Sequence, residues 1–141
     1  MPFILALSSI SKRFGAIVVA NGVDLDVNEG EALGILGPNG AGKAALFGMI
    51  TGTVPPDSGR IVFQGEDITH LPPDKRCRRG IARAFQIPQP FGGMTVFENL
   101  VVAAAFGQNK STRDVYAKSV EIMERCRLAD KINRPASKLT L

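Results

Sequence analysis

The stretch EALGILGPNGAGKAALFGMITG, residues 31–52, decides the fold predicted for this chain. Its centre fits the pattern G-x-x-x-x-G-K with the run Gly37, Pro38, Asn39, Gly40, Ala41, Gly42 and Lys43. Glycines let a backbone turn sharply and direct several N–H groups at one small volume, as a phosphate group requires. The run therefore predicts a phosphate-binding loop in which Lys43 places a positive charge near the β- and γ-phosphates of a nucleotide.

The segments on either side of this loop have the composition that the motif needs. Residues 32–36 form a short, almost wholly apolar run, which is typical of a strand buried on both faces of a parallel sheet. Residues 43–51 have helical composition, and Gly52 fits the position that ends a helix. Such a helix adds unpaired N–H groups and the positive end of its dipole to the loop. Motif and context together disfavour a chance glycine-rich turn.

The last position of the motif departs from its pattern. Ser or Thr is expected there, and this chain has Ala44 followed by Ala45. A hydroxyl at that position ligates the Mg²⁺ that bridges two phosphates, whereas alanine offers no oxygen. We therefore expect nucleotide binding to persist in a weakened form, with its dependence on Mg²⁺ impaired. A sequencing or cloning change at position 44 is the alternative explanation.

Further strands are predicted on both sides of the motif. Alternating and β-branched apolar residues indicate strands at residues 5–11 and 17–27, joined by a turn around Gly15. Residues 60–63 and 81–85 have the composition of two more strands. A strand-rich first half around a phosphate loop predicts an α/β fold.

Three helices are predicted in the remainder. A short basic helix opens at residues 71–73 and ends at Gly80. The capping-box pair Thr95 and Glu98 starts a second helix that runs to about residue 106. A third carries an apolar stripe of Tyr116, Val120 and Met123. The basic residues of the first helix, which we interpret as a solvated face rather than a nucleic-acid patch, are Lys75, Arg76, Arg78 and Arg79.

Composition limits the class of protein. The chain has 141 residues and a net charge of +4, enough for one domain with one core. No apolar run approaches the roughly 18 residues that span a bilayer, and the N-terminal residues make a poor signal peptide, so we expect a cytoplasmic protein. Cys77 and Cys126 are far apart and lie in no metal-ligand pattern, which favours two free thiols.

Several stretches beyond the glycine loop resemble one family. GPNGAGK is followed by ALFGMITG, then by PDSGRIVFQGEDIT, and then by RRGIARAFQIPQPFGGMTVFENL. Together they resemble the ATP-binding subunits of ABC transporters, and FQIPQPF is most similar to the branched-chain amino acid importers. The resemblance implies an α/β P-loop NTPase fold with an antiparallel β subdomain. Residues 1–141 would then be the N-terminal part of a single ATP-binding domain.

The resemblance also implies roles for residues outside the loop. Phe14 would stack on the adenine of ATP, with Val19 lining the same pocket, because stacking needs a flat apolar surface. Phe14 as ordinary core beside a turn is the alternative. Gln86 would reach Mg²⁺ with its amide oxygen and orient the attacking water with its NH₂ group.

Implied partners are a second ATP-binding subunit, in a dimer, and membrane permease subunits. The permease contact would be the loop at residues 87–94, which carries Ile87, Phe91 and Met94; Phe91 turned back into the core is the alternative. The protein would be peripheral on the inner face of the cell membrane, powering uptake of branched-chain amino acids, with no nucleic acid bound.

The family's signature motif, of the LSGGQ type, is expected just after the last residues, 138–141, so the sequence is interpreted as truncated before it. A Walker B strand, a catalytic glutamate and a switch histidine are likewise missing, and His70 is interpreted as surface. No catalytic residue is expected within this chain, and whether it is an ATPase stays open. The alternative function is a non-hydrolysing nucleotide-binding fragment or an inert truncated product.

Overall fold

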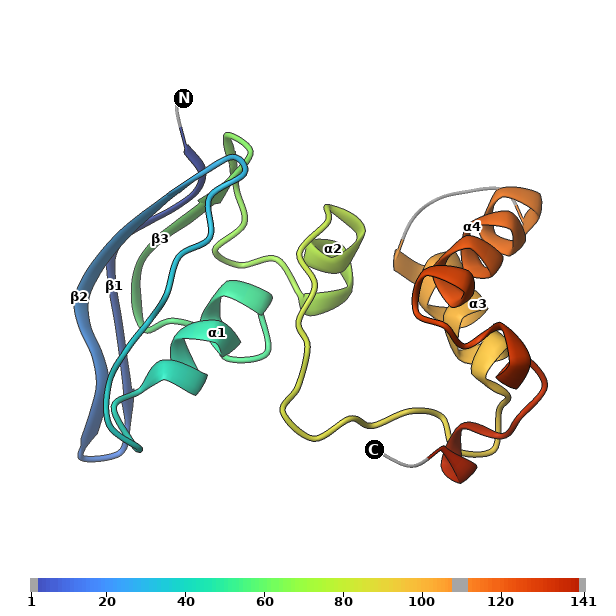
Figure 1. Ribbon diagram of the computed structural model, residues 1–141. Helices are drawn as coiled ribbons and strands as arrows, with labels where there is room; N and C mark the ends of the chain where they lie inside the picture. Colours follow the sequence, from blue (N-terminus) through green and yellow to red (C-terminus); the bar gives the residue numbers. More distant parts are fainter. Residues whose placement is uncertain (1–2, 108–111, 140–141) are drawn as a thin grey trace. The chain divides into compact units, whose positions relative to one another are not determined.

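Residues 3–107 and 112–139 are described by the computed structural model in Figure 1. They form two compact units, Met1–Arg76 and Cys77–Leu141, each of which is treated by itself below. The expectation that residues 1–141 belong to one domain stays a prediction. Thr140 and Leu141, at the expected start of the signature region, lie outside the described residues.

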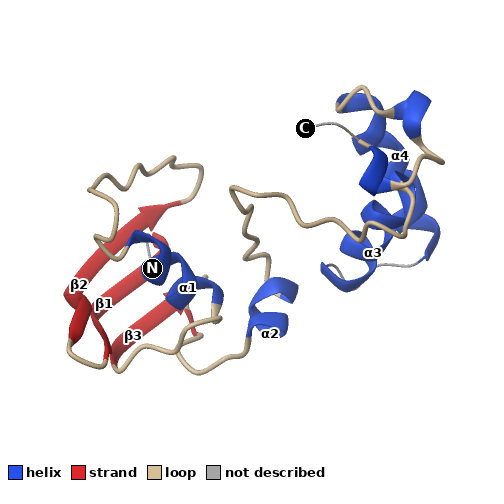
Figure 2. Cartoon of the chain, turned by 90° about the horizontal axis from the view of Figure 1, so that it is seen from below, coloured by secondary structure: helices blue, strands red, loops and turns tan. Residues whose placement is uncertain are grey.

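The first unit is built on an antiparallel sheet of four strands in the order β2-β1-β3-β4. β1 (Phe3–Phe14) pairs with β2 (Ile17–Asn28) across a tight hairpin, and β3 (Ser58–Phe63) pairs with the other side of β1 and with the short β4 (Glu66–Asp67). The helix α1 (Lys43–Thr51) lies over one face of this sheet (Figures 1 and 2). The predicted antiparallel β part is thereby confirmed.

The core of this unit lies between the sheet and α1. Leu7 and Ile10 of β1, Ile61 of β3 and Met49 of α1 are all at most 2% exposed, as is Ile68 just after β4. Residues that alternate along β1 point to the same face, which is why a strand with both apolar and polar residues buries one side only. Each fully buried aliphatic side chain contributes about 1.5–3 kcal/mol to the free energy of unfolding.

Two predicted strands are wrong. Residues 32–36 and 81–85 belong to no strand of the described sheet, and Leu36 is 96% exposed. An extended segment becomes a strand only when a neighbouring strand takes up its N–H and C=O groups. In the described part of the chain neither segment has such a neighbour, so an apolar composition alone does not make it one.

The prediction of a solvated basic face is wrong for Arg76. This helix, α2 (Pro73–Arg78), carries Arg76 into the interior, where the residue is 1% exposed. Its guanidinium donates to the carbonyl oxygens of Met49 at 2.6 Å and Ile50 at 3.0 Å, in the last turn of α1. It also donates to Leu71 O at 2.8 Å and Thr69 O at 2.9 Å. The side chain therefore caps the C-terminus of α1 and fixes the segment after β4.

The glycine that ends α1 is required by the same contact. Gly52 has a φ of +83°, the left-handed conformation that favours glycine, and a Cβ there would lie 2.9 Å from Arg76 Nε. Burial lowers the pKa of Arg76, yet a guanidinium keeps its proton under all ordinary conditions. The positive charge of Arg76 therefore lies inside the protein at the C-terminal end of α1, where the helix dipole is negative.

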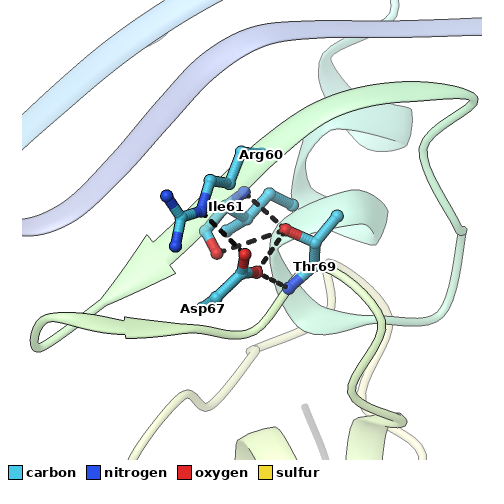
Figure 3. A network of polar contacts seen from close by, with 4 residues as sticks. All are labelled: Arg60, Ile61, Asp67 and Thr69. Atoms are coloured by element: carbon cyan, nitrogen blue, oxygen red, sulfur yellow. Dashed lines mark hydrogen bonds and ion pairs between the residues drawn. The ribbon is translucent and has the colours of Figure 1, made fainter.

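A polar network closes the far edge of the sheet (Figure 3). Asp67 accepts hydrogen bonds from the Thr69 hydroxyl at 2.6 Å, the Thr69 N–H at 2.9 Å and Arg60 Nε at 2.7 Å. These contacts, those of Thr69 first, hold the pKa of Asp67 at about 2. Because the folded pKa lies below the unfolded one, this stabilisation is present above pH ~4 and is lost as the pH falls towards 2.

The second unit is helical. Its helices α3 (Val96–Gly107) and α4 (Thr112–Arg125) pack together, and the centroids of the Phe97 and Tyr116 rings lie 5.5 Å apart. Two short 3-10 helices follow, η1 (Ala129–Lys131) and η2 (Ala136–Lys138). The predicted capping box is confirmed: Thr95 N donates to Glu98 Oε2 at 2.7 Å, and Glu98 N donates to Thr95 Oγ1 at 3.2 Å.

The buried face of α4 differs from the predicted stripe. Val115, Ser119 and Met123 are at most 3% exposed, whereas Tyr116 and Val120 are 47% and 42% exposed. Ser119 escapes a search for apolar spacing because it is polar, yet its hydroxyl is satisfied by Val115 O at 2.8 Å. A serine that bonds its own helix can replace an apolar residue on the inner face.

Replacing Arg76 tests the internal cap. Arg76→Ala should lower the free energy of unfolding by about 3 kcal/mol, because four carbonyl oxygens lose a charged donor in a dry environment. Arg78→Ala, on the exposed side of the same helix, is the matched control and should change stability by less than about 0.5 kcal/mol. Urea unfolding followed by circular dichroism measures both; equal losses in the two variants would contradict the capping role.

Candidate functional site

The glycine loop lies between residues 29–36 and α1, and two of its glycines adopt left-handed conformations. Gly40 has φ +85° and Gly42 has φ +82°, values that L side chains rarely adopt. The N–H of Ala41 donates to Pro38 O at 3.2 Å and closes a tight turn. The predicted start of the helix at Lys43 is confirmed, and Leu46 N to Gly42 O at 2.9 Å is among its first bonds.

Gly42 is required at its position by a close approach to β2. A Cβ built on Gly42 would lie 2.1 Å from the carbonyl oxygen of Val19, far inside van der Waals contact. The loop backbone therefore rests directly against the second strand. Val19, predicted from the family resemblance to line a nucleotide pocket, is placed beside the loop by this contact.

Lys43 folds back over the loop that precedes it. Its ammonium group donates to Pro38 O at 2.7 Å and also to Gly37 O. A Cβ on Gly37 would lie 3.3 Å from the Cβ of Ala41 and 4.0 Å from Lys43 Nζ, so the loop closes tightly around the ammonium group. The positive charge is thus held at the mouth of the loop by backbone oxygens, which a phosphate oxygen could replace as its partner.

The first turn of α1 presents its N–H groups without competition. No side-chain hydrogen bond caps this helix, and no acidic residue lies in its first turn. Ala44 is exposed and Ala45 half-buried, so neither side chain blocks the turn or adds a polar atom to it. Free N–H groups, a helix dipole and one lysine form a site suited to an anion.

A small cavity of about 110 Å³ opens between the loop and β2. Its wall is mainly apolar and includes Val19, Ala20, Val23, Ile35, Gly42 and Leu46. Sequence reasoning missed Val23, although its alternation with Asp24 along β2 indicates an inward side chain. The cavity provides an apolar surface next to the phosphate loop.

Phe14 lies at the hairpin end of β1 and is 50% exposed. Lys12 Nζ lies 5.4 Å from the centroid of its ring and forms an ion pair of 2.7 Å with Asp57 Oδ1. Sequence reasoning missed both charged residues, because Lys12 looks like a surface lysine in an alternating strand. Phe14 is therefore neither core nor free surface, but a half-exposed ring next to a cation.

A full metal site is not assembled by the described residues. Within residues 3–107 and 112–139, no group of three or more His, Cys, Asp or Glu side chains could hold a metal ion. Ala44 offers no ligand, and Gln86 is exposed in the second unit, where its predicted role stays a prediction. The residues at the loop thus fit the phosphates of a nucleotide, and position 44 carries a methyl group where the motif expects a hydroxyl.

The predicted contact loop of the second unit carries exposed apolar side chains. Ile87, Phe91 and Met94 are 72%, 58% and 38% exposed, so Phe91 does not turn back into the core. The backbone beneath Phe91 is held on both sides: its N–H donates to Asn99 Oδ1 at 2.9 Å, and its carbonyl accepts from Asn99 Nδ2 at 3.2 Å. A fixed backbone thus presents an exposed aromatic ring.

Comparison with known protein families and curated proteins gives consistent matches. A family model described as ABC transporter matches residues 20–140. Among curated relatives, the "Probable branched-chain amino acid transport ATP-binding protein LivG" of Methanocaldococcus jannaschii is 44% identical over 99 residues, 70% of this chain and 38% of its own length. The "Lipopolysaccharide export system ATP-binding protein LptB" of Haemophilus influenzae is 38% identical over 121 residues, 86% of this chain and 50% of its own length.

Solved structures agree with this match. A nucleotide-free ATP-binding cassette from an ABC transporter gives a TM-score of 0.82 at 34% identity, covering 98% of this chain and 59% of that one. An ATP-binding cassette in its ADP conformation gives 0.83 at 34% identity, covering 99% and 60%. The chain thus spans between two fifths and three fifths of the length of the LivG relative and these cassettes.

Two glycines of the loop give a matched test of the contact with β2. Gly42→Ala should destabilise the first unit by about 3 kcal/mol or more, because the new Cβ overlaps Val19 O. Gly40→Ala has the same sign of φ but open space around it, so it should cost only about 1 kcal/mol of backbone strain. Denaturant unfolding of both variants measures the difference, and similar losses would contradict the close approach.

Proposed function

The chain belongs to the ABC transporter family, and on that premise we propose that it binds ATP with the triphosphate on residues 37–43 and acts as the ATP-binding subunit of a transporter. The single observation that supports this most is the loop itself. Its backbone lies against Val19, its lysine folds over its mouth, and an uncapped helix begins at its end. These are the parts that a polyphosphate needs.

The base of the nucleotide is proposed to lie between the loop and the hairpin end of β1. Phe14 supplies a half-exposed ring on which adenine stacks, and Val19 lines the side of the pocket next to Gly42. Each lies in the first unit with the loop. Base and triphosphate would then be bound by one rigid sheet-and-helix body.

Magnesium is proposed to contribute less here than a phosphate loop normally allows. The hydroxyl that would ligate the ion is replaced by the methyl group of Ala44, and no group of three or more His, Cys, Asp or Glu side chains in the described part of the chain could hold a metal ion. Phosphate charge would be balanced mainly by Lys43 and the N–H groups of α1. Tight, metal-dependent hydrolysis is thereby disfavoured, and a nucleotide-binding role without turnover is the second candidate function.

The transported substrate is proposed to be a branched-chain amino acid. The LivG relative, and the branched-chain amino acid transport protein BraF of Pseudomonas aeruginosa, are each 44% identical to this chain. The lipopolysaccharide exporters are less similar, at 37–38%, although they match more of the chain. Higher identity favours the importer, and longer coverage keeps the exporter as its competitor.

Partners are proposed to be a permease and a second ATP-binding subunit. The exposed residues Ile87, Phe91 and Met94 form the surface for the permease. Among the described helices, none has the length and apolar character needed to span a bilayer. Attachment to the inner face of the cell membrane would therefore be through the permease.

The first test separates the anion cradle from the metal. Lys43→Ala should reduce ATP affinity by about tenfold or more, through loss of a charge-assisted contact with phosphate. Ala44→Thr should raise affinity only when Mg²⁺ is present, because it restores a metal ligand and not a phosphate ligand. Isothermal calorimetry with Mg²⁺ and with EDTA measures both effects. An equal gain in EDTA would sink the metal explanation, and unchanged binding in Lys43→Ala would sink the proposed site.

The second test addresses the permease. Cys77 and Cys126 are exposed and free, so both are first replaced by serine. Phe91→Cys in the complete transporter should then cross-link to a permease subunit, whereas Glu124→Cys, exposed on α4, should not. Each single cysteine is labelled with a maleimide photo-cross-linker, which needs no cysteine on the permease, and gel electrophoresis after illumination detects the product. Equal cross-linking of both cysteines, or none from position 91, would count against this surface.

A further inference from the structure

The ring of Phe14 has a neighbour that the proposed site does not use. Lys12 Nζ lies over it at 5.4 Å from the centroid, within the range of a cation–π interaction. Both residues are on β1, two positions apart, so their side chains share one face of the strand. A cation on a ring fixes the ring's position and covers part of its π surface.

Lys12 itself is unusually constrained for a lysine. The residue is only 9% exposed, and its ammonium group donates to Asp57 Oδ1 at 2.7 Å. A lysine side chain on the surface keeps much of its rotamer freedom, whereas this one has lost it to burial. Its side-chain conformation is therefore already ordered in the folded protein before any ligand binds.

Asp57 ties this lysine to the strand at several points. Its Oδ2 accepts from the N–H of Arg13 at 2.7 Å, and its own N–H donates to Ser11 O at 2.9 Å. Hydrogen bonding from Lys12, first, and from the Arg13 N–H lowers the pKa of Asp57, so the carboxylate stays charged at neutral pH. The residues on either side of Lys12 are thus clamped to the loop that precedes β3.

We propose that Lys12, held by Asp57, is a positioning residue for the nucleotide base: it fixes the ring of Phe14 from one side and leaves the exposed remainder of the ring to stack on adenine. The proposal rests on the proposed function, since it requires a base at Phe14. It adds a selectivity element that acts on the base and not on the phosphates. Lys12 touches the platform and does not touch the ligand.

An ordinary structural ion pair is the competing explanation, and the two differ in what they predict. An ion pair that only stabilises β1 would affect every ligand of the loop equally. A positioning residue would affect ATP and leave a ligand without a base unchanged. Inorganic triphosphate is that ligand, because it offers the loop three phosphates and offers Phe14 nothing.

The experiment measures the dissociation constants of ATP and of inorganic triphosphate in the full chain at fixed ionic strength. Lys12→Met keeps the apolar stem and removes the charge; it should weaken ATP about three- to tenfold and change triphosphate by less than about twofold. Lys12→Arg keeps a cation over the ring and should retain the preference for ATP. Lys118→Met removes a comparable pair with Glu121 on α4 and should change neither constant.

The outcomes separate this inference from the proposed function. Equal weakening of ATP and triphosphate in Lys12→Met would overturn the positioning role. Loss of ATP preference in Phe14→Ala without any loss in Lys12→Met would also overturn it, while the base site itself would stand. No effect of Lys43→Ala on triphosphate would instead sink the loop as the phosphate site. If Lys12→Met does not fold, Lys12→Arg decides, because lost ATP preference in that folded variant contradicts the proposal.

Discussion

The first unit depends on one buried cation that joins pieces of chain far apart in sequence. Arg76 reaches the last turn of α1 from a helix that begins more than twenty residues later, and it binds the segment after β4 with the same guanidinium. A planar group with five donors can meet carbonyl oxygens in two directions, which an ammonium group does less well. α1 is held at its C-terminus by this side chain and at its N-terminus by the contact of Gly42 with β2. The helix that opens the phosphate loop is thus fixed at both ends.

This arrangement explains why the loop has its shape before any ligand binds. Its shape is set by the close approach of Gly42 to the backbone of Val19 and by the Lys43 side chain, which bonds Pro38 O. Preorganised donors lose little entropy when an anion arrives, so more of the interaction energy appears as affinity. The ring of Phe14, which we propose as the platform for the base, is positioned in a similar way by the ion pair of Lys12 and Asp57. The loop and the ring of Phe14 both lie in the first unit.

The sequence allowed the loop, its helix and the capping box to be predicted, because each depends on local chemistry. Lys43 and the pair Thr95 and Glu98 act within a few residues of themselves, and Gly42 is marked by its motif although its close contact is with Val19. The burial of Arg76 and Lys12 could not be predicted, because their partners are far away in the sequence and lie close only in the folded chain. The apolar run at residues 32–36 was wrongly predicted to be a strand, because a strand needs a neighbouring strand to pair with as well as a suitable composition. On α4, a search for apolar spacing misses Ser119, because its side chain is polar although it is buried.

The clamp of Asn99 on the backbone of Phe91 has a consequence for recognition. One amide side chain occupies both the N–H and the C=O of Phe91, and it also donates to Thr95 O at 2.9 Å. A flexible loop would have to be frozen by whatever docks on it, at a cost of about 1–2 kcal/mol for each residue ordered. Here the backbone beneath the exposed ring is already held by Asn99. A partner that docks on this ring would therefore not have to order the backbone beneath it.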